Sequence, residues 1–137
     1  MDITGGCLCK SVRFRISAPP IAARLCWCRV CQYVAAGNAT VNVIFPNDAL
    51  RVEGTLTDYR SVADSGNVMH RSFCPLCGTH VFSASEARPH LVIVRNGTLD
   101  DTGLTRPGAT IWTASAPDWA WIDESLPTHA GQPPPAA

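Results

Sequence analysis

The sequence predicts an all-β single domain, and four features of its 137 residues support that prediction. Short runs of alternating apolar and polar residues recur along the chain, a pattern typical of half-buried strands. Glycine and proline separate these runs, as they do in many all-β domains. The length suits one domain of about 100–150 residues. The hydrophobic content of 46% is that of a globular protein.

The expected strands follow one another along the chain with breaks between them. Alternating residues predict a strand at 12–16, which Pro19 and Pro20 end, and another at 41–45, which ends at Pro46. Further strands are expected at 50–53, 56–60, 68–73, 81–83 and 91–95.

Turn residues and one helix complete the expected local structure. The runs 50–53 and 56–60 flank Gly54 and predict a hairpin. One short helix is expected at about 30–36, with Gly37 as its cap. The domain is expected to span residues 1–129, and the Pro/Ala-rich tail 130–137 to be disordered.

The charge balance excludes several classes of partner. Eleven basic residues balance eleven acidic ones, so nothing indicates binding to nucleic acid or to an anionic membrane. No apolar run approaches the roughly 20 residues of a membrane span. Residues 1–6 lack the basic and apolar regions of a signal peptide, so the expected location is the cytoplasm.

Seven cysteines carry the chemistry of this sequence. In a cytoplasmic chain they indicate metal ligands rather than disulfides, and an odd count agrees with this. Both Cys-x-Cys and Cys-x-x-Cys spacings occur, and each can direct two thiolates toward one ion. Tetrahedral thiolate sites suit zinc or iron, and zinc is the metal we expect. The seven are Cys7, Cys9, Cys26, Cys28, Cys31, Cys74 and Cys77.

Seven ligands divide into a closed site of four and an open site of three, but the spacing alone leaves two divisions possible. One division groups Cys7 and Cys9 with the pair at 74 and 77, and leaves Cys26, Cys28 and Cys31 as the second site. The other is a zinc-ribbon pairing of 28 and 31 with 74 and 77. We prefer the first division, because it keeps the middle Cys-x-Cys-x-x-Cys segment as one compact loop around one ion.

Three segments resemble the glutathione-dependent formaldehyde-activating enzyme family, also called the centromere protein V family. They are Gly5-Gly6-Cys7-Leu8-Cys9, Cys26-Trp27-Cys28-Arg29-Val30-Cys31 and Arg71-Ser72-Phe73-Cys74-Pro75-Leu76-Cys77-Gly78-Thr79. The resemblance runs from about residue 5 to about residue 119. It implies an Mss4-like fold of small antiparallel sheets organised around two zinc sites.

The resemblance also implies a role for each cysteine. It implies a structural zinc on Cys7, Cys9, Cys74 and Cys77, and a catalytic zinc on Cys26, Cys28 and Cys31. Two positions depart from the family pattern. Trp27 stands where the family often has His, which changes the wall of the open site. Lys10 stands where the family often has Gly.

Other residues were weighed as contributors to the open site. Arg29 and Arg71 are candidates to offset thiolate charge or to bind a carboxylate. Trp112 and Trp119 are expected in the core. The histidines are expected to be ordinary surface or strand residues, and these are His70, His80, His90 and His129. A solvated acidic face is expected at Asp118, Asp123 and Glu124.

The expected function is that of a zinc-dependent carbon–sulfur lyase. Zinc on three thiolates can hold a thiol as thiolate at neutral pH, which makes the sulfur both a nucleophile toward an aldehyde and a leaving group. The substrate would be an adduct of glutathione, or a similar thiol, with formaldehyde or another small aldehyde. The absence of an H-x-E motif excludes a zinc deaminase.

A non-enzymatic zinc module that binds a partner protein is the rival hypothesis. In that case a histidine, a partner residue or a fourth cysteine would close the middle site. The sequence predicts no oligomeric state.

Overall fold

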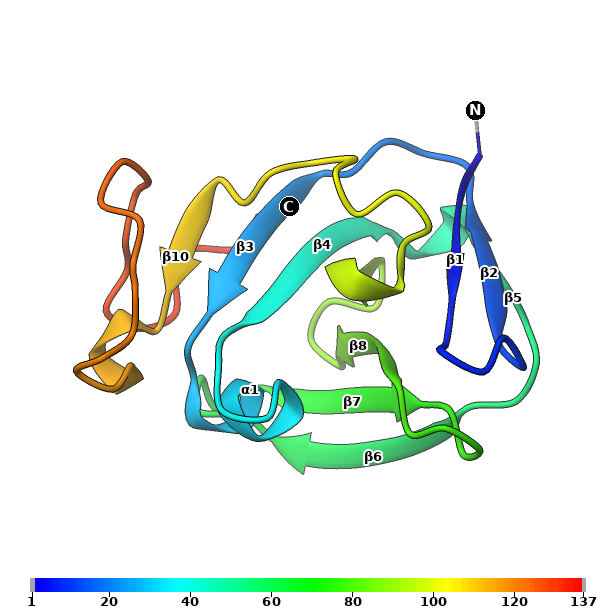
Figure 1. Cartoon of the computed structure of the whole chain (residues 1–137), viewed down its shortest axis with the longest axis horizontal. Helices are drawn as coiled ribbons and strands as arrows, with labels where there is room; N and C mark the ends of the chain where they lie inside the picture. The colour runs from blue at the N-terminus through cyan, green and yellow to red at the C-terminus, as the bar shows by residue number, and fades with distance from the viewer. Residues whose placement is uncertain (1, 137) are drawn as a thin grey trace.

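Two β-sheets form the protein, as Figure 1 shows for the computed structural model, which describes residues 2–136. The smaller sheet has the order β1-β2-β5, with β1 at Ile3–Gly6, β2 at Arg13–Ile16 and β5 at Leu50–Glu53. The larger sheet has seven strands in the order β10-β3-β4-β9-β8-β7-β6. The predicted all-β class is therefore confirmed.

The larger sheet brings distant parts of the chain together. Its strands, in spatial order, are β10 at Ala109–Ile111, β3 at Ala22–Cys26, β4 at Thr40–Pro46, β9 at Leu91–Arg95, β8 at His80–Ser85, β7 at Val68–Phe73 and β6 at Thr57–Val62. One helix, α1, spans Arg29–Val34, close to the predicted range, but its C-cap is Ala35 and not the predicted Gly37. Three short 3-10 turns lie at Asn47–Ala49, Asn96–Thr98 and Thr113–Ser115.

The predicted hairpin around Gly54 is wrong. Strand β5 pairs with β2 in the smaller sheet, whereas β6 pairs with β7 in the larger one. Gly54 has a φ of +100° and turns the chain from one sheet into the other. The two neighbouring strands therefore belong to different sheets. Local alternation of apolar and polar residues is the same in this arrangement as in a hairpin, so it cannot distinguish the two.

The sheets are antiparallel except at one edge. Strand β10 pairs with β3 in parallel, with Ile111 opposite Cys26. This pair makes the larger sheet mixed, and a long connection separates its two strands in the sequence, as parallel pairing requires. Strands β1, β3 and β10 were not among the predicted strands, because they are short and lack clean alternation.

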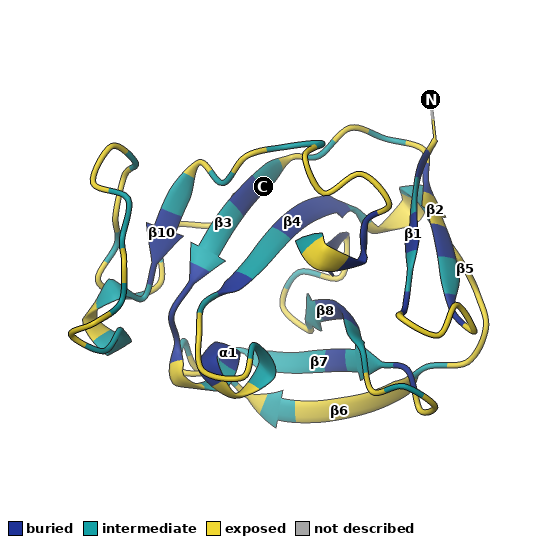
Figure 2. Cartoon of the chain, viewed as in Figure 1, coloured by how far each residue is buried: buried dark blue, intermediate teal, exposed yellow. Residues whose placement is uncertain are grey.

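The core lies between the two sheets and depends on alternation along the strands. Phe14 of β2 and Phe82 of β8 meet edge to face, with ring centroids 5.1 Å apart. Val43 and Phe45 of β4 are fully buried on the same side. Figure 2 shows this burial along β2 and β4, whereas β6 is mostly exposed. The opposite face of the larger sheet is thus free to carry polar residues.

A substitution at Gly54 tests how closely the backbone packs where the chain passes from the smaller sheet to the larger one. A Cβ at Gly54 would lie 2.2 Å from the Ser11 carbonyl oxygen, so Gly54→Ala adds a backbone clash to the strain of positive φ. Gly66→Ala is the matched control, because Gly66 also has positive φ but nothing within 4 Å of the added Cβ. We expect a loss of about 1 kcal/mol in unfolding free energy for Gly66→Ala, and about 3 kcal/mol for Gly54→Ala. Equal losses in urea unfolding would contradict this account.

Candidate functional site

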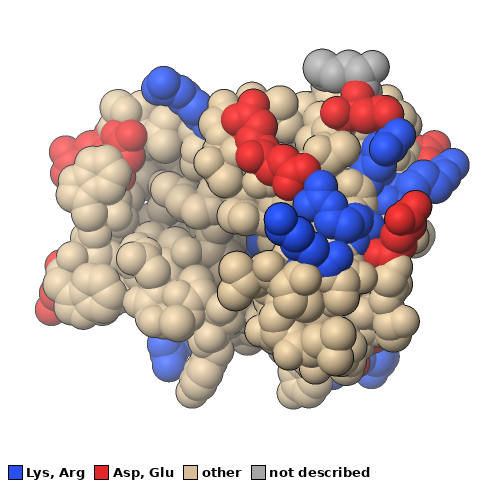
Figure 3. Space-filling model, turned by 45° about the vertical axis from the view of Figure 1, so that its right-hand side comes forward, with Lys and Arg blue, Asp and Glu red and all other residues tan. Residues whose placement is uncertain are grey.

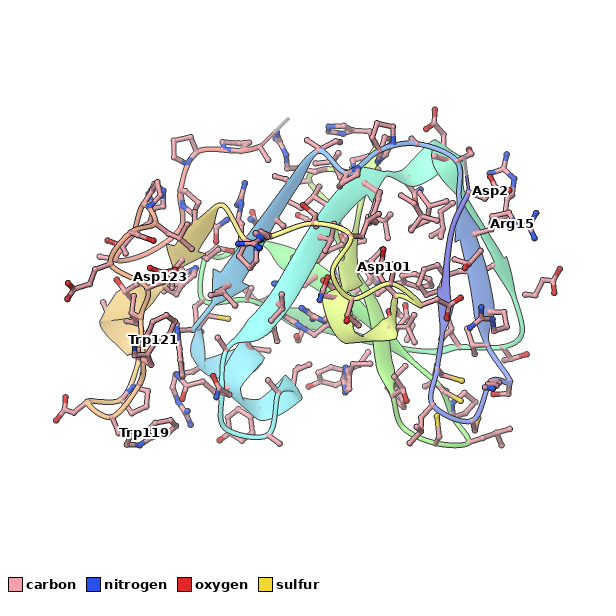
Figure 4. All side chains as sticks on the ribbon, turned by 45° about the horizontal axis from the view of Figure 1, so that its top comes forward. Asp2, Arg15, Asp101, Trp119, Trp121 and Asp123 are labelled. Carbon is pink, nitrogen blue, oxygen red and sulfur yellow. The ribbon has the colours of Figure 1, made fainter. Side chains whose placement is uncertain are left out.

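Four cysteines meet where the two sheets come together, and we call them the four-cysteine group. Cys7 follows β1 and Cys9 lies in the turn before β2, while Cys74 and Cys77 lie in the turn between β7 and β8. Their sulfur atoms all lie within 4.8 Å of one another. Figure 4 shows yellow sulfur atoms where the β1–β2 turn meets the β7–β8 turn.

The geometry of the four-cysteine group fits a tetrahedral metal ion. A tetrahedral ion with metal–sulfur bonds of about 2.3 Å requires sulfur–sulfur distances of about 3.8 Å. The Cys7–Cys9 and Cys9–Cys74 sulfur distances are 3.6 Å and 3.8 Å. Backbone N–H groups donate to two of the sulfurs, from Val12 to Cys7 at 3.3 Å and from Leu76 to Cys74 at 3.4 Å. Such donors stabilise thiolates, which are the form that binds metal.

Local hydrogen bonds favour the thiolate form of two members of this group, Cys7 and Cys77. Burial alone raises the pKa of Cys7, but hydrogen bonds from the Val12 N–H and the Ser11 side chain bring it down to about 7. Hydrogen bonds from Thr79 lower the pKa of Cys77 to about 5. The turn that holds Cys77 closes through Gly78, whose N–H donates to the Cys74 carbonyl at 2.9 Å and whose φ is +76°.

The remaining three cysteines form a second, buried group at the end of β3, the three-cysteine group. Cys26 is the last residue of β3, Cys28 caps the N-terminus of α1, and Cys31 lies within α1. All three sulfurs lie within 4.8 Å of one another. The Cys31 N–H donates to the Cys28 sulfur at 3.3 Å, so the start of the helix fixes this pair.

The three-cysteine group can hold a metal ion with three protein ligands. Contacts with Cys28 and Cys31 raise the pKa of Cys26, because a further negative charge among the three sulfurs is unfavourable. A bound cation would remove this penalty. Among residues 2–136, no histidine or carboxylate joins either cysteine group.

A cavity of about 150 Å³, the central cavity, lies against the three-cysteine group. One face of the larger sheet forms its wall, because register partners on neighbouring strands point to the same side. Two rows of register partners line it, Arg24, Asn42 and Arg95 in one and Ile44, Ile93, Ser83 and Arg71 in the other.

Four arginines give the described lining of the central cavity most of its charge. Arg71 was expected near the site, and it does line the cavity. Arg24, Arg88 and Arg95 line it as well, and the sequence reasoning did not single them out. A usable signal existed for Arg24 and Arg95, since each is a charged residue in an otherwise apolar strand.

Arg29 lies away from the central cavity, unlike Arg71. Its guanidinium donates to the Gln32 side chain at 2.8 Å and lies over the ring of Tyr33. Its backbone N–H donates to Asp64 at 3.0 Å, which anchors the start of α1 to the β6–β7 turn. Arg29 therefore positions the helix rather than lining the cavity.

The tryptophans are placed differently from the expectation. Trp27 is buried and meets Trp119 edge to face, and it is absent from the cavity lining. Trp119 is exposed, so its expected core position is wrong. Figure 4 shows Trp119 and Trp121 on the C-terminal loop, far from Asp2 and Arg15. Trp112 lines the cavity and has a φ of +60°, a strained conformation that often marks functional sites.

The C-terminal segment completes the cavity near Trp112. The indole N–H of Trp112 donates to the Gln132 side chain at 3.0 Å, and its backbone N–H donates to the Gly131 carbonyl at 3.3 Å. Gln132, Pro135 and Ala136 are also part of the cavity lining. The division of the chain into a domain at 1–129 and a tail at 130–137 stays a prediction.

The four histidines lie outside both cysteine groups. His70 bonds to Asp58 at 2.6 Å and to Glu86 at 2.7 Å on the outer part of the larger sheet. His80 is partly buried in β8, and burial lowers its pKa. His129 bonds through its backbone to Thr110. His90 accepts a backbone hydrogen bond from Asn47.

Comparison with known proteins places the chain in a family. The family profile described as "Glutathione-dependent formaldehyde-activating enzyme" matches residues 2–115. The chain belongs to this family. The matched segment includes both cysteine groups and every strand of the two sheets.

Two known proteins are similar to this chain. A curated Halomonas elongata protein named "Putative glutathione-dependent formaldehyde-activating enzyme" is 28% identical over 130 residues, which cover 90% of this chain and 82% of that protein. A crystal structure of a Rhodobacter sphaeroides protein matches with a TM-score of 0.58 at 22% identity, covering 71% of this chain and 87% of that one. The second likeness supports the fold alone.

Two further structural facts bear on the sequence-based expectations. All seven cysteines are free thiols, as expected for candidate metal ligands. Within residues 2–136, no helix has the length and apolar character needed to cross a membrane.

A substitution at Lys10 tests whether the backbone of the β1–β2 turn, which holds Cys7 and Cys9, is strained. It stands where the family often has glycine, and its φ of +67° is in the left-handed region that disfavours side chains. Lys10→Gly should therefore stabilise the protein by about 0.5–1 kcal/mol, the relief of strain being partly offset by the greater freedom of glycine in the unfolded chain. A thermal melt that is unchanged or lowered would contradict the strained turn. Lys10 forms no salt bridge with any of residues 2–136 that the substitution would remove.

Proposed function

We propose that the protein is a zinc-dependent carbon–sulfur lyase that acts on an adduct of glutathione, or a similar thiol, with a small aldehyde such as formaldehyde. The observation that carries this proposal is the position of the three-cysteine group. Its three sulfurs line a cavity, and no fourth ligand from residues 2–136 completes the group. Family membership gives the class of chemistry, glutathione-dependent formaldehyde activation.

The two cysteine groups would take different roles. Cys7, Cys9, Cys74 and Cys77 would hold a structural zinc, since four thiolates leave no open position. Cys26, Cys28 and Cys31 would hold the catalytic zinc, which supplies an open coordination position that keeps an incoming thiol in its thiolate form. The free cysteines would suit a reducing cytoplasm.

The chain's own residues supply charge balance and orientation. Arg95 and Arg24 lie close enough to the three-cysteine group for its thiolates to raise their pKa values, although burial lowers both overall. These guanidinium groups offset the negative charge of the sulfurs and of an incoming thiolate. Arg71 lies farther along the same wall, where it can orient the substrate.

The reaction needs no redox partner. In the synthetic direction a carbon–sulfur bond forms between the thiol sulfur and the aldehyde carbon, and the thiol proton ends on the former carbonyl oxygen. In the lyase direction the same bond breaks and the proton returns. The small volume of the central cavity would exclude bulk water from the reacting atoms.

Substitutions at the two groups should have different consequences for metal content and stability. The wild-type chain should carry two zinc ions by native mass spectrometry. Cys74→Ala removes a ligand that joins the two sheets, so it should abolish the cooperative thermal transition, because structural zinc contributes on the order of 10 kcal/mol to folding. Cys31→Ala should leave a folded chain with one zinc ion. Equal melting temperatures for the two variants would refute the division of roles.

A cobalt-substituted protein tests the open position directly. Cobalt should give a thiolate charge-transfer spectrum that changes when glutathione is added, because the added sulfur becomes a ligand of the three-cysteine group. S-methylglutathione is the matched control, since it cannot supply a thiolate and should leave the spectrum unchanged. A spectrum that does not respond to millimolar glutathione would instead support a closed site and a non-enzymatic zinc module.

A further inference from the structure

The central cavity carries more positive charge than the sulfur chemistry beside it requires. Its lining includes four arginines, Arg24, Arg71, Arg88 and Arg95. Asp64 is the single acidic residue in the described lining, and its carboxylate already accepts the Arg29 N–H. Zinc on three thiolates has a net charge of about −1. With Asp64 adding one more negative charge, about two positive charges remain unbalanced.

The arginines of the cavity also lack acidic partners. Arg71 donates to the Ser61 hydroxyl at 3.0 Å and Arg95 to the Asn42 side-chain oxygen, and both of these acceptors are neutral. Arg71 and Arg95 are only 4% and 8% exposed, and no carboxylate of residues 2–136 forms an ion pair with any of the four arginines. The Nε atoms of Arg71, Arg88 and Arg95 are buried without a hydrogen-bond partner. A buried cation without an anion is unfavourable, so these donors indicate a site for an anionic ligand.

Arginines elsewhere on the protein show the contrast. Arg13 pairs with Asp100 at 2.6 Å, and Arg15 pairs with Asp2 at 3.2 Å, both at the smaller sheet. Figure 3 shows basic and acidic side chains side by side on this face. Arg29, Arg51 and Arg106 also form no ion pair within residues 2–136, but all three are exposed to solvent. Among the described residues, the guanidinium groups that are both shielded from water and without an anion are those of the cavity.

The size of the cavity limits which anion it can enclose. Pockets for drug-sized ligands measure about 300–1,000 Å³, and this cavity measures about 150 Å³. Glutathione is a tripeptide of drug-like size, so the cavity can enclose its thiol but not its two terminal carboxylates. The cavity therefore suits the smaller reactant, and the unpaired arginines require that this reactant be negatively charged.

We propose that the aldehyde handled at this site carries its own carboxylate, as a short 2-oxo acid does. This inference rests on the proposed lyase function and names its substrate class. The thiol sulfur bonds to the aldehyde carbon, the thiol proton ends on the carbonyl oxygen, and the carboxylate lies unchanged among the arginines. A bound thiolate and a carboxylate together bring two negative charges, which matches the unbalanced charge of the cavity.

Exchange rates measured by NMR test the proposal with the zinc-loaded wild-type protein. The probes are glyoxylate, which carries a carboxylate, and glycolaldehyde, a neutral aldehyde of similar size, each mixed with glutathione. We expect the protein to accelerate exchange between thiol and adduct at least about tenfold more for glyoxylate than for glycolaldehyde. The reason is that charge-assisted hydrogen bonds to the carboxylate add about 1.5–3 kcal/mol. The preference should persist with N-acetylcysteamine, a thiol without carboxylates.

Arg88→Gln is the matching variant, because Arg88 is only partly buried and its Nε has no partner to lose. It should reduce the acceleration for glyoxylate about tenfold and leave that for glycolaldehyde unchanged. Arg106→Gln is the control, since Arg106 is exposed and lies outside the central cavity. Arg88→Met, which keeps a long side chain at this position, provides a second test if thermal melts show that Arg88→Gln is unfolded.

The outcomes separate this inference from the proposed function. Equal acceleration for glyoxylate, glycolaldehyde and formaldehyde would leave the lyase function standing and overturn the carboxylate preference. A preference that disappears with N-acetylcysteamine would assign the arginines to the carboxylates of the thiol, and would also overturn it. Acceleration of no adduct at all would overturn both proposals.

Discussion

The contact between two turns at the four-cysteine group is the constraint on which the rest of the structure depends. The β1–β2 turn brings Cys7 and Cys9 to the β7–β8 turn, which holds Cys74 and Cys77. Four sulfurs about 3.8 Å apart repel as thiolates, so the contact requires a cation to be stable. It fixes β7 and β8 relative to the smaller sheet, and β7 carries Arg71 to the wall of the central cavity.

The larger sheet then brings together cysteine thiolates and arginine guanidinium groups in the protein interior, where such charges are rare. The end of β3 supplies the three-cysteine group, while strands across the same face supply guanidinium groups that are buried and unpaired. Burial lowers the pKa of Arg95, and the nearby Cys31 thiolate acts in the opposite direction. Sulfur and arginine thus stabilise one another, and the charge that remains faces the cavity where an anionic substrate would complete the balance.

Sequence reasoning succeeded where a signal is local and failed where it is not. Strands β5, β7 and β9 have the bounds that alternation and apolar runs predicted. The hairpin at Gly54 was wrongly predicted, and the parallel pairing of β10 with β3 was not predicted. Both depend on which strands pair with each other, and no local sequence pattern determines strand pairing. Cysteine spacing left two divisions of the seven residues open, and the structure brings together the sets of the preferred division. Arg24 and Arg95 join the site only because strand register places them on one face.

Cadmium-113 NMR of the fully substituted protein tests the central claim most directly, because the chemical shift of cadmium reports how many sulfur atoms bind it. Our account predicts two resonances of equal intensity, one typical of four sulfur ligands and one of three. Added glutathione should move only the second resonance, toward the position of the first. A single resonance would contradict this account. So would two resonances that are both typical of four sulfur ligands and do not shift with glutathione, because the account requires one closed site between the sheets and one open site that faces the cavity.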